Sequence, residues 1–151
     1  MIIVSLLFVG YQLRDANRST HAGTIQSVTD TETRFIALAM EHAEIWDRIV
    51  SGNSFADLPR CDVRRGVLLI NFFMIESENR FRQFRVGTLD EASWNRRANS
   101  LHNMFNCPIY DIWRESPGSA SRSVEFLACV DKLYADTLVN ETSQPIKGDS
   151  N

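Results

Sequence analysis

Residues 67–75 read VLLINFFMI, and residues 76–85 continue as ESENRFRQFR. The nine residues 67–75, apolar except for Asn71, are too few to cross a bilayer, which takes roughly 20. A helix that is apolar on nearly all sides is typical of the centre of a bundle. Phe81 and Phe84 are interspersed with arginines, so this part of the helix is expected to bury one side only. We therefore predict a central helix, covered on nearly all sides at residues 67–75, that ends at Gly87.

Further helices are predicted downstream of this segment. Residues 88–91, TLDE, match a capping box, in which Thr88 and Glu91 would satisfy free N–H groups at a helix start. Apolar residues then recur at helical spacing as far as Phe105. Pro108 is expected to open a short helix, residues 116–119 are expected to form a turn or loop, and a last helix is expected from about Ser123.

Upstream, a long helix is predicted. Apolar residues from Ile25 to Ile49 recur mainly three and four positions apart, which indicates one buried stripe. Gly52 would end this helix, because glycine is favoured just past a helix C-terminus. No segment alternates in the manner of a strand. The expected fold is therefore all-α, a small bundle of four to six helices over residues 21–138, followed by a disordered tail over residues 139–151.

The N-terminal segment is the main clue to location. Residues 1–13 read MIIVSLLFVGYQL, carry no charge and stop at Arg14. At about 1.5 Å per residue they reach about two thirds of a membrane span, and they lack the basic start of a signal peptide. We predict that residues 1–20 form a membrane anchor, either truncated or interfacial, with the domain facing the cytoplasm because Arg14 and Arg18 follow it. The alternative is a soluble cytoplasmic bundle whose first helix is core or oligomer interface.

Composition and motifs argue against several functional classes. The net charge of -3 gives no electrostatic footprint for nucleic acid. Cys61, Cys107 and Cys129 are odd in number and widely separated, which disfavours a disulfide framework. The chain has no Glu-x-x-His metal spacing, no Gly-x-Ser-x-Gly elbow and no phosphate-binding glycine loop. We predict a protein without a cofactor that is not an enzyme.

One weak catalytic pattern remains as an alternative. Arg97 and His102 match the Arg-x4-6-His spacing of helical ribonuclease domains, in which the pair would bind and protonate a phosphate. The chain has fourteen arginines and three histidines, so about one such match is expected by chance. The ribonuclease-like function therefore ranks below a binding function.

Residues 78–94, ENRFRQFRVGTLDEASW, resemble the signature of a family of small bacterial proteins. In that family Glu-Asn, an aromatic pair near a Gln, Gly-x-Leu-Asp-Glu and Trp occur in this order. The resemblance extends to residues 43–46, to Pro108 and Trp113, and to residues 126–131. It implies an N-terminal transmembrane helix followed by a small all-helical domain, and it implies no activity.

The same residues predict a buried polar network. Buried polar groups must be paired, so Glu78 is expected to bond to an arginine or to a tryptophan N–H. Such a network would fix the register of the helices; a ligand or partner pocket is the alternative. We predict a membrane-tethered domain that binds an unknown protein partner or senses a signal, with oligomerisation possible. The candidate network residues are Trp46, Glu78, Asn79, Gln83, Asp90, Trp94 and Trp113.

Overall fold

A computed structural model describes the backbone of residues 2–105 and 107–142, and the side chains of residues 8–105 and 107–136. These residues form seven helices and no strand, which confirms the predicted all-helical class. The predicted number of helices is too low. One expected helix is divided in two, and the expected loop at residues 116–119 contains a four-residue helix.

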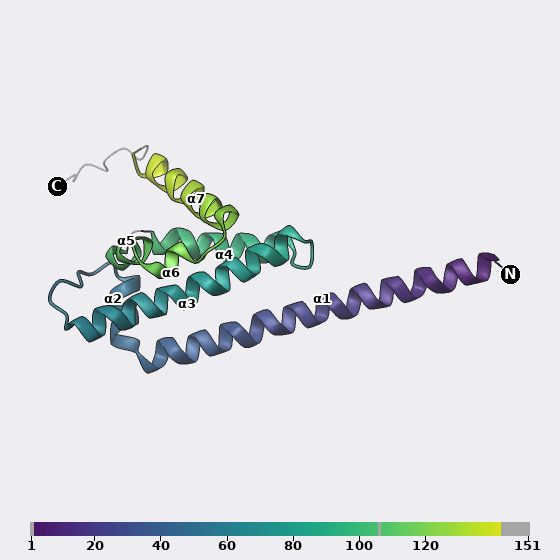
Figure 1. Cartoon of the computed structure of the whole chain (residues 1–151), viewed down its shortest axis with the longest axis horizontal. Coiled ribbons are helices and arrows are strands. Elements are labelled where there is room, and N and C mark those ends of the chain that lie inside the picture. The colour runs from purple at the N-terminus through teal and green to yellow at the C-terminus, as the bar shows by residue number, and fades with distance from the viewer. Residues whose placement is uncertain (1, 106, 143–151) are drawn as a thin grey trace, which may run out of the picture.

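The centre of the bundle is α3 (Arg60–Arg85), as the sequence predicts. It packs against α1 (Ile2–Glu41), α2 (Ala43–Val50), α4 (Glu91–Met104) and α5 (Pro108–Arg114) (Figure 1). This position explains why α3 carries the most buried side chains, and why polar groups on it meet partners from several helices.

The apolar run of α3 is less covered than predicted. Leu69, Ile70 and Met74 are buried, but Leu68 and Ile75 are 60% and 43% exposed. The seven-residue spacing of Leu68 and Ile75 places them on one side of the helix. That side forms one wall of a groove beside α1 and is not covered by another helix.

The first long helix breaks where the sequence contains no helix breaker. The predicted continuation through residue 49 is wrong, because α1 ends at Glu41 and α2 begins after His42. The backbone of His42 leaves the helical region, with φ -120° and ψ 42°. Ile45 and Ile49 of α2 are then buried. The change of direction at His42 therefore allows the apolar side chains of α2 to be buried.

Glycine ends two helices, as predicted. Gly52 and Gly87 have positive φ angles of 65° and 77°, which residues other than glycine rarely adopt. After α3, Gly87 N–H donates to the carbonyl of Phe84 and Thr88 N–H donates to that of Gln83, which is the Schellman arrangement. These bonds satisfy carbonyls that the end of the helix would otherwise leave free.

The predicted capping box is displaced by two residues. Asp90 is the N-cap of α4, and its Oδ1 accepts from the Ser93 N–H at 2.7 Å. The Thr88 hydroxyl donates instead to the carbonyl of Gln83. Thr88 belongs to the end of α3, so it cannot also cap α4, and Asp90 is the next residue whose side chain can accept.

The C-terminal part packs on the far side of the bundle from α1. Pro108 occupies the first turn of α5, and α6 (Pro117–Ala120) and α7 (Val124–Thr142) follow. The helix α7 packs on α4 and extends to Thr142, so the prediction of disorder from residue 139 is wrong for residues 139–142. Residues 143–151 lie outside the described residues. The largest fully buried side chains, which mark the core, are Trp113, Phe126, Ile49, Leu69, Ile70, Met74, Leu101, Ile109 and Val130.

Candidate functional site

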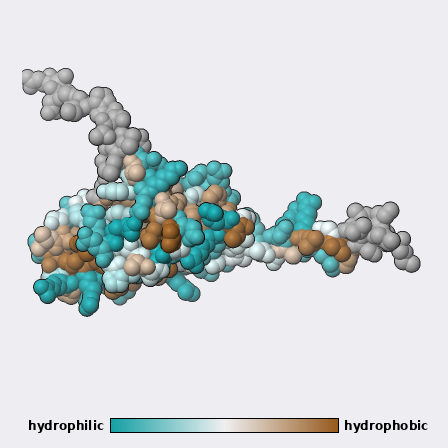
Figure 2. Space-filling view, turned by 45° about the horizontal axis from the view of Figure 1, so that its top comes forward, coloured by the Kyte–Doolittle hydropathy of each residue, from teal (hydrophilic) through white to brown (hydrophobic). Residues whose placement is uncertain are grey.

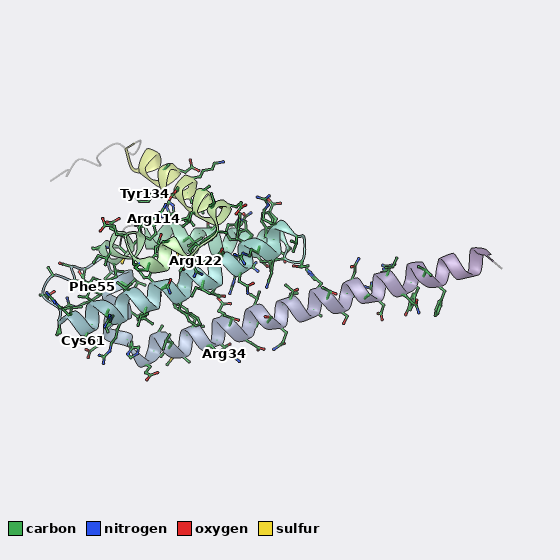
Figure 3. All side chains as sticks on the ribbon, viewed as in Figure 1. Arg34, Phe55, Cys61, Arg114, Arg122 and Tyr134 are labelled. Atoms are coloured by element: carbon green, nitrogen blue, oxygen red, sulfur yellow. The ribbon has the colours of Figure 1, made fainter. Side chains whose placement is uncertain are left out.

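The N-terminal half of α1 projects from the body as a single helix (Figure 1). We call residues 2–20 the N-terminal arm. Phe8, Tyr11 and Leu13 are 60%, 70% and 63% exposed, and every residue from 8 to 23 is exposed. Figure 2 shows apolar side chains on this projecting part, and in Figure 3 the side chains there stand away from the other helices. Residues 8–13 of the arm therefore expose apolar side chains that the described body does not cover.

The arm meets the body at the loop between α3 and α4. His21 Nδ1 lies 3.0 Å from the carbonyl oxygen of Thr88. A cleft of about 860 Å³ lies beside this contact and includes Leu13, Arg14 and Arg18 on one wall and Val86 on the other. Two arginines therefore follow directly after the apolar part of the arm, at the edge of the body.

No helix among residues 2–105 and 107–142 contains a stretch long and apolar enough to cross a membrane. The predicted transmembrane form of the anchor is therefore not supported by these residues. Met1 lies outside the described residues. The physical reason is length, because charged residues begin at Arg14 and interrupt the apolar stretch.

A second candidate site is a buried ion-pair cluster around Glu76 of α3. Glu76 is 3% exposed. Its Oε1 accepts from Arg80 Nε at 2.8 Å, and its Oε2 accepts from Arg97 Nη2 of α4. The guanidinium of Arg97 also lies 4.5 Å from the centre of the Phe73 ring, in cation–π geometry. One carboxylate thus pairs with two buried guanidinium groups.

The helix α1 supplies the second carboxylate of this cluster. Glu32 Oε2 lies 3.2 Å from Arg80 Nη2, and the Glu32 side chain is 51% exposed. Burial lowers the pKa of Arg97, and the positive charge of Arg80 lowers it further. The negative charges of Glu76 and Glu32 act in the opposite direction and raise this pKa. The two positive charges of the arginines are thus balanced by the two carboxylates, and Glu32 is the most exposed residue of the cluster.

A cleft between α1 and α4 opens onto this cluster. It has a volume of about 350 Å³. Arg80, Arg96 and Arg97 line it together with Glu32 of α1. Arg96 is exposed and donates through Nη2 to the Ser93 hydroxyl at 2.9 Å. The cleft therefore brings together three arginines from two helices.

Glu78 lies two residues after Glu76 and on nearly the opposite face of α3. It is buried, and its carboxylate accepts from Arg82 at 2.7 Å, from Arg122 at 3.2 Å and from the Ser123 N–H at 2.9 Å. In Figure 3 Arg122 lies where the segment between α6 and α7 meets α3. Burial alone would raise the pKa of Glu78, but the hydrogen bonds from Ser123 and the charge and hydrogen bond of Arg82 outweigh it and lower the pKa. Glu78 is a structural tie between α3 and the start of α7.

The structure assembles only part of the predicted polar network. Glu78 bonds to arginines, as expected. Asn79 is exposed and accepts from Gln83 at 3.5 Å, and the Oε1 atom of Gln83 is buried without a hydrogen-bond partner. Asp90 is exposed and caps α4. Neighbours on one helix point in different directions, so Asn79 does not join Glu78.

The three tryptophans belong to the apolar core, and none of them is seen to donate to Glu78. Trp46 packs edge-on against Phe35, with ring centres 5.1 Å apart. Trp94 packs against Phe81 and Phe84. Trp113 donates through Nε1 to Asn71 Oδ1 at 3.2 Å. Of the two expected kinds of partner for Glu78, arginine or tryptophan, the structure therefore has arginine, in Arg82 and Arg122.

The two residues of the ribonuclease alternative do not converge. Arg97 is buried against Glu76, whereas His102 is exposed. Five residues of helix separate the two side chains by about 140° around the axis. They line different clefts, since His102 faces the cleft between α2 and the end of α4. This geometry does not support joint action on one phosphate.

The buried cysteines and the possible metal ligands give no support for thiol or metal chemistry at these sites. Burial raises the pKa of the Cys107 and Cys129 thiols, which disfavours their reactive thiolate form. Within the described part of the chain, no three His, Cys, Asp or Glu side chains are grouped to hold a metal ion.

Sequence reasoning missed most of the ion-pair cluster. Glu76 and Arg80, and likewise Glu78 and Arg82, are four residues apart, a spacing that favours ion pairs on one helix face. That signal was available in the sequence. The contributions of Glu32 from α1 and Arg122 from the loop before α7 come from residues 44 or more positions from their partners, and no local pattern indicates them.

No protein-family model, curated protein or solved structure was found to match this chain. The family resemblance at residues 78–94 therefore stays a prediction, and the functional argument depends on the geometry described above.

Proposed function

We propose that this protein is a helical domain that associates with a membrane surface through the apolar N-terminal arm. The observation that carries this proposal is the exposure of Phe8, Val9, Tyr11 and Leu13 on a helix that projects beyond the body. Apolar side chains of this size gain roughly 1.5–3 kcal/mol each when they leave water. An exposed group of apolar side chains is typical of a surface that binds a membrane or another protein.

Residues 2–13 on their own support insertion into the membrane interface. Residues 2–13 extend about 18 Å as a helix, against about 30 Å of hydrocarbon. Arg14 and Arg18 follow at once and would lie at the level of the lipid headgroups. An anionic membrane would attract them, and their side chains can reach the interface while the apolar residues enter the acyl region.

The body would then be held close to the membrane. A groove of about 340 Å³ between α1 and α3, lined by Leu38, Leu68, Phe72 and Ile75, supports the binding of a protein partner there. This part of the proposal follows from the exposed apolar wall of α3 and does not depend on the arm. We propose no catalytic role, because Arg97 and His102 do not converge.

Flotation with lipid vesicles tests the membrane proposal. The full chain is mixed with vesicles of phosphatidylcholine containing a minority of phosphatidylglycerol, and is expected to float with them. The double variant Phe8→Glu, Leu13→Glu should lose roughly 100-fold in vesicle affinity, because two apolar side chains no longer leave water. The matched control Met40→Glu, Val124→Glu changes two other exposed apolar residues and should float like the wild type.

Two results would contradict the proposal. One is a wild-type chain that stays unbound with these vesicles; the other is equal loss of flotation in the arm variant and the control variant. A molecular mass by light scattering that falls from dimer to monomer in the arm variant alone would instead assign the arm to a second copy of this chain.

A further inference from the structure

We propose that the cleft between α1 and α4 binds a small free oxyanion of the phosphate class, held by Arg80, Arg96 and Arg97 at the position that the Glu32 carboxylate now occupies. The argument depends on the ion-pair cluster and is independent of the proposed membrane association.

The charges of the cleft favour an anion. Arg80 and Arg97 are buried, and Arg96 reaches the same cleft from its exposed rim. Glu76 neutralises only one of these three positive charges. Glu32 adds one negative charge, which leaves the cleft with an excess of one positive charge. Replacement of Glu32 by a doubly charged phosphate would bring this local balance to zero.

Arg80 also has a donor at this place that is ion-paired but poorly aligned for hydrogen bonds. Its side chain is 9% exposed, and its Nη2 atom is buried without a hydrogen bond. The distances from Nη2 to Glu32 and Glu76 are those of ion pairs, but the angles are not those of hydrogen bonds. A buried donor without a hydrogen bond is costly, and an oxyanion has acceptors in several directions.

Glu32 is suited to be displaced. It is the half-exposed member of the cluster, and it comes from a different helix than its partner Arg80. An ion pair with one exposed partner contributes little to stability, so an anion of higher charge can compete with it. The Glu32 carboxylate therefore stands in for the ligand in the unliganded protein.

The arginines would carry the binding energy. The hydroxyls of Thr29 and Ser100 line the cleft, but each donates to a backbone carbonyl of its own helix, at 3.0 and 3.1 Å. They can only accept further hydrogen bonds. Charged donors are consequently the groups that select an oxyanion, and planar guanidinium groups match its oxygens.

Isothermal titration of the full chain with inorganic phosphate at low ionic strength tests this site. Glu32→Gln removes the competing carboxylate and should tighten binding roughly tenfold, and Arg96→Ala should weaken it roughly tenfold. The matched controls are Glu44→Gln and Arg64→Ala, which change exposed residues of the same charge away from the cleft and should leave the affinity unchanged. Arg96 is exposed, so its loss should not unfold the bundle.

Other outcomes would overturn the proposal. These are an absence of phosphate binding, equal effects of the site variants and their controls, or the same heat when phosphate is replaced by chloride at equal ionic strength. The variant Phe8→Glu, Leu13→Glu separates this inference from the membrane proposal. Phosphate binding should persist in it, and its loss would place the anion on Arg14 and Arg18 of the arm.

Discussion

The N-terminal arm and the centre of α3 reverse the usual relation between polarity and burial. On the arm, Phe8, Tyr11 and Leu13 face solvent, while the charged side chains of Glu76 and Arg80 on α3 are buried. Both segments are regular α-helix. The difference lies in their neighbours, because α3 is surrounded by four helices and the arm by none.

The comparison teaches that burial is decided by available partners. Charges enter the core of this bundle because opposite charges from other helices reach them: Arg97 from α4 and Arg122 from the segment before α7. On the arm, Phe8, Tyr11 and Leu13 remain exposed, although Leu13 lines a cleft with Val86 at the edge of the body. An exposed apolar surface and a buried charge both reduce the stability of the fold. Both are therefore good candidates for functional sites.

Removal of the Glu76 carboxylate should produce the largest effect on stability. In Glu76→Ala the guanidinium groups of Arg80 and Arg97 lose their shared counter-charge inside the bundle. The free energy of unfolding is expected to fall by roughly 3–5 kcal/mol. Urea denaturation followed by circular dichroism measures it. The control Asp62→Ala breaks an i,i+3 pair with the exposed Arg65 and should cost at most about 1 kcal/mol. Equal losses would show that the burial of Glu76 does not matter.

The same substitution in the two regions should give a smaller but clear contrast. Leu101 of α4 is fully buried and Leu13 of the arm is 63% exposed. Leu101→Ala should reduce the free energy of unfolding by roughly 2–5 kcal/mol, because it leaves a cavity. Leu13→Ala should change it by less than about 0.5 kcal/mol. Urea denaturation without lipid measures both; a large loss at Leu13 would mean that the arm packs on the body.

Acid should produce the smallest effect, through Glu78. Its pKa is lowered in the folded protein, so the unfolded chain binds the proton more readily. The stability that ionised Glu78 contributes is complete above the ordinary glutamate pKa of 4.5 and is lost as the pH falls through the lower pKa of the folded state. Protonation weakens the hydrogen bonds from Arg122 and Ser123 without removing their geometry, so the expected loss is about 1 kcal/mol.

Urea denaturation of the wild type and of Glu78→Gln at neutral and acid pH measures the stability that ionised Glu78 contributes. The difference in unfolding free energy between the two chains should shrink as the pH falls. A constant difference would show that the charge of Glu78 does not stabilise the fold. Asp57, an exposed partner of Arg48, offers the control Asp57→Asn, since its lowered pKa reflects a pair in contact with solvent.

The parts of the fold that were predicted correctly depend on local physics. The absence of alternating patterns indicates helices, Gly52 and Gly87 end two of them because they accept positive φ, and Pro108 opens another. The pairing of Glu78 with an arginine was one of two expected alternatives, because a buried carboxylate must be paired, and Arg82 lies one helical turn away. Each of these signals acts within about six residues.

The parts that were missed depend on contacts between distant segments. No local residue indicates the break at His42 or the exposure of Leu68, whereas the capping of α4 by Asp90 is local and was simply assigned to the wrong residue. The arrival of Glu32 at Arg80 joins residues 48 positions apart, and Trp113 finds Asn71 instead of Glu78. Such contacts arise only when α1, α4 and α5 pack around α3.

The sequence by itself determined the helical class, the central position of residues 67–75, the two glycine-ended helices and the charge-free start of the chain. Helical hydrogen bonds and glycine backbone freedom are short-range, so they can be inferred from neighbouring residues. Only the tertiary structure decided that the arm would stand in solvent and that Glu76 would be buried between Arg80 and Arg97. The reason is that burial and charge pairing depend on which distant helix occupies the adjoining space.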